Sequence, residues 1–195
     1  MLAFPILYEP ALQMDKIFGY SPYAATILAM TCGYFAWDVL LCLRFHHLHG
    51  PWFLLHAISC FTVYFLSFHP IFQYYGGVFL MYELSTPFLN VHWFCDKLGL
   101  TGSRLQIVNG LILVCVFFSA RIVYGYYQSA LFFMNIAARF SEIPLYLIAV
   151  YTSANILLNI LNAFWLYKMI VSVSRRLNSN ASVVDDDRGG KVKKM

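Results

Sequence analysis

The chain has 195 residues, of which 61% are hydrophobic, 18% aromatic and 11% charged. These proportions exclude an ordinary soluble globular domain. The stretches 45–82 and 143–167 contain no Asp, Glu, Lys or Arg, and about 20 apolar residues are enough to cross a bilayer. The net charge of +4 lies largely near the carboxyl end, which favours a flank against anionic lipid over binding to nucleic acid. The composition therefore predicts one polytopic, all-α transmembrane helical bundle.

In chain order, residues 1–20 contain two prolines and scattered charges and are expected to form an N-terminal loop. Ser21 followed by Pro22 is typical of a helix start, with serine capping the first turn and proline in the first helical position. The sequence then predicts about five spans, over residues 22–43, 51–70, 71–94, 105–127 and 141–173. Residues 128–141 are too short and too polar for a crossing, so we expect a re-entrant or interfacial segment there.

These elements divide the chain into the N-terminal loop 1–20, a transmembrane domain over 21–173 and a basic tail over 174–195. With five crossings, the segments 44–50 and 95–104 lie on the same side of the membrane as the tail. Together these segments carry most of the lysine and arginine outside the spans. The positive-inside rule then predicts that the carboxyl end is cytosolic.

The stretch 81–93 places several polar side chains inside an apolar region. At helical spacing Glu83, Thr86 and Asn90 share one stripe, and Pro87 interrupts the backbone hydrogen bonding between them. Because proline has no amide hydrogen, the carbonyl of Glu83 is expected to be free for another donor. Polar groups at membrane depth are costly unless they face a partner or a cavity, so this helix is predicted to line an interior.

Asp38, Glu83 and Arg121 are the formal charges expected at membrane depth. An unpaired charge there is costly, so Arg121 is expected to neutralise one of the two acids. The other interpretation is functional, with Arg121 meeting an anionic lipid head or an acyl-CoA phosphate.

Two further sets of polar residues have more than one interpretation. His56 on the second span is either a packing residue or a general base that takes a proton from an amine or a hydroxyl at a cavity. On the last span, polar side chains recur at helical spacing at Thr152, Asn155, Asn159 and Asn162. That stripe either joins helices through hydrogen bonds or lines a ligand cavity.

No metal or other cofactor is expected. His46, His47 and His49 lie in a short turn with no acid or cysteine nearby, which does not favour a zinc site. The five cysteines have no paired spacing and lie mostly within predicted spans, so we interpret them as small apolar residues.

Taken together, these residues resemble the TLC-domain family, the ceramide-synthase-like proteins of the endoplasmic reticulum. The residues that carry the resemblance are Gly33-Tyr34 and Asp38, the segment from Glu83 to Trp93, Asn109-Gly110 and Arg121. The resemblance covers about residues 22–175 and is closer to the uncharacterised TLC-domain-containing branch than to the synthases. The family generally carries one or two helices before the first span seen here, so the chain is expected to be a short relative or an incomplete one.

The departures from the synthases concern the reacting groups. Where the synthases have two adjacent histidines this chain has His56-Ala57, and where they have His-Asp it has Tyr82-Glu83. A later aspartate corresponds to Thr86. Amide formation needs a base for the amine proton and an acid for the leaving thiolate, and only His56 and Glu83 remain as candidates.

The resemblance implies a protein of membrane lipid homeostasis that binds or handles a membrane lipid in an intramembrane cavity. The residues expected to take part are Asp38, His56, Glu83, Ser85, Asn90, Asn109 and Arg121. One alternative is an acyl-CoA-dependent N-acyltransferase with His56 and Glu83 as catalytic residues. A second alternative is a structural membrane protein whose polar stripes only hold its helices together.

The carboxyl end carries a separate signal. Lys191 and Lys193 lie five and three residues from the end, which fits the pattern Lys-x-Lys-x-x. The pattern resembles a dilysine retrieval signal, which a vesicle coat binds on the cytosolic side. This resemblance implies residence in the endoplasmic reticulum membrane with the carboxyl end in the cytosol.

Overall fold

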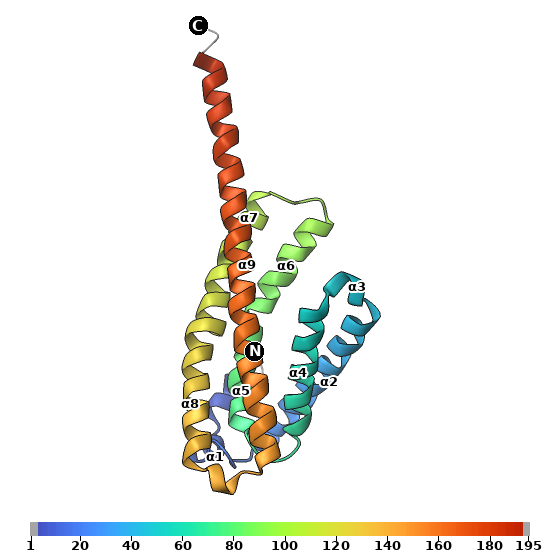
Figure 1. Cartoon of the computed structure of the whole chain (residues 1–195), viewed down its shortest axis with the longest axis vertical. Coiled ribbons are helices and arrows are strands. Elements are labelled where there is room, and N and C mark those ends of the chain that lie inside the picture. Colours follow the sequence, from blue (N-terminus) through green and yellow to red (C-terminus); the bar gives the residue numbers. More distant parts are fainter. Residues whose placement is uncertain (1–3, 193–195) are drawn as a thin grey trace.

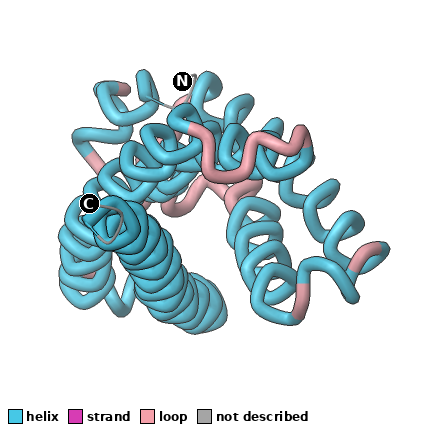
Figure 2. The backbone as a smooth tube through the Cα atoms, turned by 90° about the horizontal axis from the view of Figure 1, so that it is seen from above, coloured by secondary structure: helices cyan, strands magenta, loops and turns pink. Residues whose placement is uncertain are grey.

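The computed structural model describes residues 4–192, with side chains described for residues 4–48 and 50–174. Within that part of the chain the regular elements are helices and no strand is present (Figure 2). The elements are a 3-10 helix at Phe4–Tyr8, α1 (Pro10–Met14), α2 (Pro22–Arg44), α3 (His46–His49), α4 (Pro51–Leu66), α5 (Gln73–Leu80), a 3-10 turn at Met81–Ser85, α6 (Thr86–Lys97), α7 (Arg104–Phe117), a π-helical turn at Phe118–Tyr124, α8 (Gly125–Ala138), a 3-10 turn at Phe140–Glu142 and α9 (Leu145–Val192).

These helices pass up and down the bundle in chain order (Figure 1). The successive passes are α2, then α4, then α5 with α6, then α7 with α8, and finally α9. Helix α2 packs on α4, α4 packs on α9, and α6 packs on α7. The order agrees with the predicted succession of spans and places segments distant in the sequence side by side.

Among the described residues, three helices are long and apolar enough to cross a membrane, at Pro22–Arg44, Arg104–Ala138 and Leu145–Ser174. Pro51–Leu66 is a shorter apolar helix. The third pass differs from the predicted continuous span over 71–94, because the 3-10 turn at Met81–Ser85 divides it into α5 and α6. The prediction of an all-α polytopic membrane bundle is confirmed.

The start of α2 follows the sequence signal. The side chain of Ser21 accepts a hydrogen bond from the amide of Ala24 at 3.4 Å, and Pro22 lies in the first turn. The backbone amide of Ser21 in turn donates to Oε1 of Gln73, on α5, at 3.1 Å. The cap of one helix is therefore also a contact with another.

The N-terminal segment is more ordered than the predicted loop. Residues Phe4–Tyr8 and Pro10–Met14 form short helices, and the side chains of Ile6, Leu12 and Ile17 are buried. A loop was expected from the prolines and charges, but proline is compatible with the first turn of a helix. The apolar residues between the charges pack this segment into the bundle core.

Residues 128–138 are likewise not a separate re-entrant or interfacial segment. They continue the helix that begins at Arg104. No proline interrupts the helix from Arg104 to Ala138. Its polar residues Gln128 and Ser129 are buried in the bundle, where Ser129 Oγ accepts a hydrogen bond from Asn159 at 2.9 Å. The Ser129 hydroxyl thus joins α8 to α9 and does not mark an interfacial segment.

A charged cluster joins the N-terminal segment to the turn after α8. The guanidinium of Arg139 lies 2.7 Å from both Asp15 Oδ2 and Glu142 Oε2, and 4.5 Å from the centre of the Phe18 ring. Burial pushes the pKa of Asp15 upward, but hydrogen bonds from Arg139 and from two backbone amides outweigh it and hold that pKa below its ordinary value. The hydrogen bond from Arg139 also lowers the pKa of Glu142.

Candidate functional site

Two irregular turns meet in the interior of the bundle. One is the 3-10 turn at Met81–Ser85, and the other is the π-helical turn at Phe118–Tyr124. Single π-turns inside α-helices are rare and are frequent at functional sites. Pro87 lies in the first turn of α6, so the helix restarts directly after the 3-10 turn. The carbonyl of Glu83 accepts a hydrogen bond from the amide of Thr86, so our expectation that this carbonyl is free was wrong.

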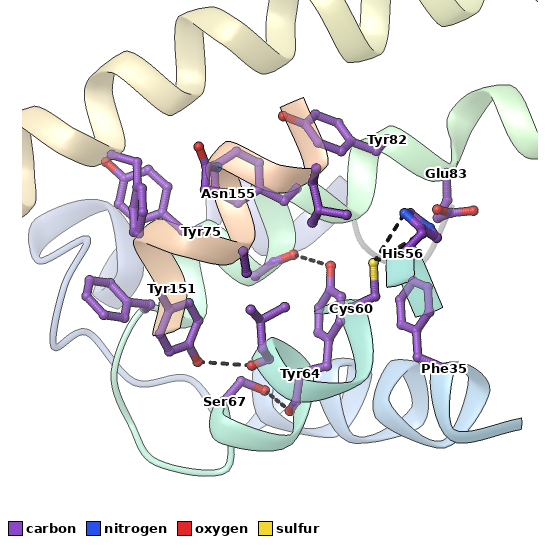
Figure 3. A pocket seen from close by; sticks show the side chains of 17 residues that line it. Phe35, His56, Cys60, Tyr64, Ser67, Tyr75, Tyr82, Glu83, Tyr151 and Asn155 are labelled. Carbon is purple, nitrogen blue, oxygen red and sulfur yellow. Dashed lines mark hydrogen bonds between the residues drawn. The ribbon is translucent and has the colours of Figure 1, made fainter. Parts of the chain in front are cut away.

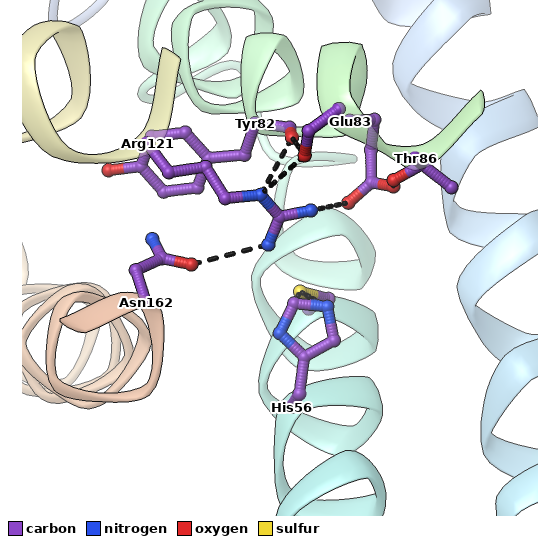
Figure 4. A network of polar contacts seen from close by, with 8 residues as sticks. His56, Tyr82, Glu83, Thr86, Arg121 and Asn162 are labelled. Carbon is purple, nitrogen blue, oxygen red and sulfur yellow. Dashed lines mark hydrogen bonds and ion pairs between the residues drawn. The ribbon is translucent and has the colours of Figure 1, made fainter. Parts of the chain in front are cut away.

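Arg121 projects from the π-turn onto the 3-10 turn and is 5% exposed (Figure 4). Its Nε donates to the carbonyl of Tyr82 at 2.9 Å and to Ser85 Oγ at 3.2 Å. One terminal nitrogen donates to Asn162 Oδ1, on α9, at 3.2 Å. The guanidinium carbon also lies 4.9 Å from the centre of the Phe117 ring. Arg121 therefore joins three passes of the bundle at one point.

Glu83 is the acid that faces this guanidinium. Its Oε1 lies 3.6 Å from Nη2 of Arg121, and its Oε2 accepts a hydrogen bond from Thr86 Oγ1 at 2.5 Å. The Glu83 side chain is 26% exposed and the Arg121 side chain 7%. The expected neutralisation of a membrane-depth acid by Arg121 is present, with the carboxylate as the more accessible partner.

His56 lies on α4, and Figure 4 places its ring beside the ion pair. The ring is edge-on to the indole of Trp165, with centroids 5.2 Å apart, and its two nitrogens lie 3.7 and 3.9 Å from the sulfur of Cys60. A thiol is a weak hydrogen-bond partner. The imidazole is therefore held by aromatic packing and retains capacity for a stronger hydrogen bond.

A cavity extends from His56 and Glu83 into the bundle (Figure 3). Its lining encloses about 720 Å³ of space, with the open mouth included. Eight of its seventeen lining residues are phenylalanine or tyrosine: Phe35, Tyr64, Phe72, Tyr75, Phe79, Tyr82, Phe132 and Tyr151. The cavity has an aromatic part and a polar part that contains the histidine and the carboxylate.

The tyrosine hydroxyls along this wall are engaged with other protein groups. They pair Tyr64 with the carbonyl of Gly76 at 3.1 Å, Tyr75 with Asn135 at 2.5 Å, Tyr82 with Asn159 at 3.2 Å and Tyr151 with the carbonyl of Val63 at 3.0 Å. What these residues present to the cavity is mainly ring surface. The aromatic part of the cavity is therefore effectively apolar.

The polar stripe of α9 serves both roles that the sequence left open. Asn155 lines the cavity, and its Oδ1 accepts a hydrogen bond from Asn159 Nδ2 at 3.1 Å. Asn159 also bonds to Ser129, which joins α9 to α8. Asn162 binds Arg121, while Thr152 is half-buried. The stripe thus holds helices together and places one amide at the cavity.

The other residues expected at the site are dispersed. Ser85 belongs to the Arg121 cluster, where it is buried. Asn109 is buried between helices and donates to the carbonyl of Phe88 at 2.8 Å. Asn90 is exposed on α6, and Asp38 is half-buried on α2, near Phe35 in sequence. Of the predicted residues, the structure therefore gathers His56, Glu83, Ser85 and Arg121.

Several parts of the site were not predicted from the sequence. The carbonyl of Tyr82 is an acceptor for Arg121, and backbone groups carry no sequence signature. Asn162 was identified in the α9 stripe, but not as a partner of Arg121. The aromatic wall comes from residues on several helices, none of which is distinguished in a chain that is 18% aromatic.

Comparison with known proteins identifies relatives over most of the chain. The model of the TLC domain family matches residues 1–171. An uncharacterised TLC domain-containing protein of Schizosaccharomyces pombe is 42% identical over 175 residues, which cover 90% of this chain and 60% of that protein. Topoisomerase I damage affected protein 4 of Saccharomyces cerevisiae is 39% identical over 153 residues, covering 76% and 55%. TLC domain-containing protein 4-A of Xenopus laevis is 32% identical over 168 residues, covering 84% and 65%.

The chain spans between about half and two thirds of the length of these relatives. None of the three is named a ceramide synthase, which agrees with the branch that the sequence resembles. No solved structure matches the chain. The family match, the identities and the apolar helices together lead to one conclusion: this chain is a membrane protein that belongs to the TLC-domain family.

Proposed function

We propose that this protein binds a membrane lipid in the cavity between α2, α4, α5 and α9 and thereby acts in membrane lipid homeostasis. The observation that carries the proposal is the cavity itself. It has an apolar, aromatic interior and a polar part at His56 and Glu83. A lipid has the same two parts, and the surrounding bilayer supplies lipid to a membrane protein at high local concentration.

A substitution that fills the cavity tests the proposal. Ala154 lines the cavity and is 8% exposed, so Ala154→Phe should occupy the space of the ligand. We expect the lipid that co-purifies in mild detergent, identified and quantified by mass spectrometry, to fall several-fold. Ile160→Phe is the matched control, because Ile160 lies on the same helix and is 61% exposed. Equal lipid content in wild type and both variants would contradict the proposal.

An N-acyltransferase is the second candidate function, and the shared location of His56 and Glu83 favours it. In such a reaction an amine attacks the carbonyl of an acyl-CoA thioester, and the C–N bond forms as the C–S bond breaks. His56 would accept the amine proton, and the departing thiolate would leave as a thiol after protonation. The chain has one histidine where the synthases have two, so the lipid-binding proposal comes first.

We further propose that the protein resides in the endoplasmic reticulum membrane with its carboxyl end in the cytosol. Figure 1 places α3, the connection from α6 to α7 and the carboxyl end of α9 at one end of the bundle. Arg44, Lys97 and Arg104 lie at this end, which agrees with the positive-inside rule. We also propose that Lys191 and Lys193 form a retrieval signal that a vesicle coat binds. Both lysines lie outside the residues whose side chains the structure describes.

Orientation can be measured directly. A tag placed after Met195 should be removed by protease added to intact microsomes, because a cytosolic end faces the added enzyme. A tag on a lumenal protein serves as the control for sealed vesicles. Protection of the tag after Met195 under those conditions would refute both the orientation and retrieval through Lys191 and Lys193.

A further inference from the structure

His56 and Glu83 have hydrogen-bonding capacity left in the cavity, while the Oδ1 of Asn155 is engaged by Asn159. Deeper in the cavity the tyrosine hydroxyls are engaged by protein groups, as in the bond from Tyr151 to the carbonyl of Val63 at 3.0 Å. The imidazole of His56, in contrast, contacts the Cys60 sulfur at 3.7 and 3.9 Å. A carboxylate has about four lone-pair positions, so Glu83 can accept from a ligand in addition to Thr86 and Arg121.

Glu83 lines the cavity, and Arg121, which lies next to it outside the lining, balances its charge. Arg121 carries one positive charge and Glu83 one negative charge, with nitrogen and oxygen 3.6 Å apart. An anionic head group would meet the carboxylate first, because Glu83 is 26% exposed and Arg121 only 7%. A cationic head group would compete with Arg121 for the same carboxylate and leave two cations side by side. Either charge would be uncompensated in surroundings made largely of aromatic rings, which is costly.

We propose that the cavity takes a single-chain lipid whose head group is uncharged and carries a hydroxyl. The hydroxyl donates its hydrogen to Glu83 and accepts a hydrogen bond from an N–H of His56, and the chain occupies the aromatic part. One chain is proposed because the cavity has a single aromatic part beside its polar groups. This inference rests on the proposed function, and it names the chemical class of the ligand.

Competition between lipids of one chain length and different head groups tests the inference. The protein is placed in phosphatidylcholine nanodiscs with a tritiated 1-O-alkylglycerol as the probe. Unlabelled alkylglycerol, an alkyl sulfate and an alkyltrimethylammonium salt then compete with it. We expect alkylglycerol to displace the probe at a concentration at least about tenfold below that needed for either charged lipid. Both charged lipids have permanent charges, so a change in their protonation state cannot alter the charge that is being compared.

A charge variant gives an independent readout of the same inference. Glu83→Gln removes the negative charge from the cavity lining and leaves the Arg121 guanidinium, 3.6 Å from that carboxylate, without its acid. In a variant that folds, the preference should shift toward the alkyl sulfate by about tenfold or more, because an anion now restores the balance. If the variant does not fold, the competition experiment with wild-type protein still tests the inference by itself.

The outcomes distinguish the two proposals. Stronger or equal displacement of the probe from wild-type protein by either charged lipid overturns the inference about the head group and leaves lipid binding intact. If a charged lipid binds and the alkylglycerol does not, the inference about the head group is likewise overturned and lipid binding is left intact. If the probe binds equally to wild type and to Ala154→Phe, this cavity is not the lipid site and the proposed function fails with it.

Discussion

Replacing Glu83 with glutamine should lower the free energy of unfolding by about 3 kcal/mol, the lower end of the range for breaking a buried ion pair. Glutamine keeps the shape of the side chain but removes the charge that balances Arg121. The Arg121 side chain is 7% exposed, so its charge cannot be compensated by water. The lower end of the range applies because Glu83 is 26% exposed and the separation in the pair is 3.6 Å. The measurement is reversible unfolding in mixed micelles, with the melting temperature in detergent as a second readout.

The matched control is Glu142→Gln. Glu142 also pairs with an arginine, at 2.7 Å, but its side chain is 51% exposed. Water and ions replace most of that interaction, so the melting temperature should hardly change.

A second comparison combines Glu83→Gln with Arg121→Gln. If the charges act as a pair, the double variant should lose less stability than the sum of the single variants. Additive losses would show that Glu83 contributes through Thr86 rather than through Arg121.

The sequence alone was sufficient to predict a structural feature where one chemical rule decides that feature. Ser21 and Pro22 mark the start of α2 because both residue types satisfy the first turn of a helix, and the structure agrees. The pairing of Arg121 with an acid followed from the cost of an unpaired charge at membrane depth, and Glu83 is such a partner. Neither inference required knowledge of the tertiary structure.

The sequence was insufficient where several segments decide the outcome together. Residues near Gln128 suggested an interfacial segment, but Gln128 is buried and Ser129 accepts a hydrogen bond from Asn159 inside the bundle. The position of Gly125 depends on a distant residue, because an added Cβ would lie 2.6 Å from the ring of Tyr82. A glycine within a helix gives no indication of which side chain lies against it. The aromatic wall of the cavity is a product of the same long-range packing.

Replacing His56 with alanine should separate binding from catalysis. The imidazole is held by the ring of Trp165 and the Cys60 sulfur, and the space it leaves opens to the cavity, so the protein should remain folded. For a lipid-binding protein the variant loses one hydrogen bond to the head group. That loss is about 0.5–1.5 kcal/mol, or roughly two- to tenfold in affinity for alkylglycerol in nanodiscs.

An N-acyltransferase predicts a different result for the same variant. Without His56 no neutral imidazole accepts the amine proton, so amide formation from acyl-CoA should stop while the melting temperature stays unchanged. His47→Ala is the control for both measurements, because His47 is exposed on α3 and outside the cavity. Lipid affinity and acyl-CoA-dependent amide formation are measured on one preparation of each protein. Complete loss of a wild-type activity in His56→Ala alone would make catalysis the function of the cavity. A modest loss of affinity with no such activity in wild type supports binding, because Glu83 and the aromatic wall still hold the lipid.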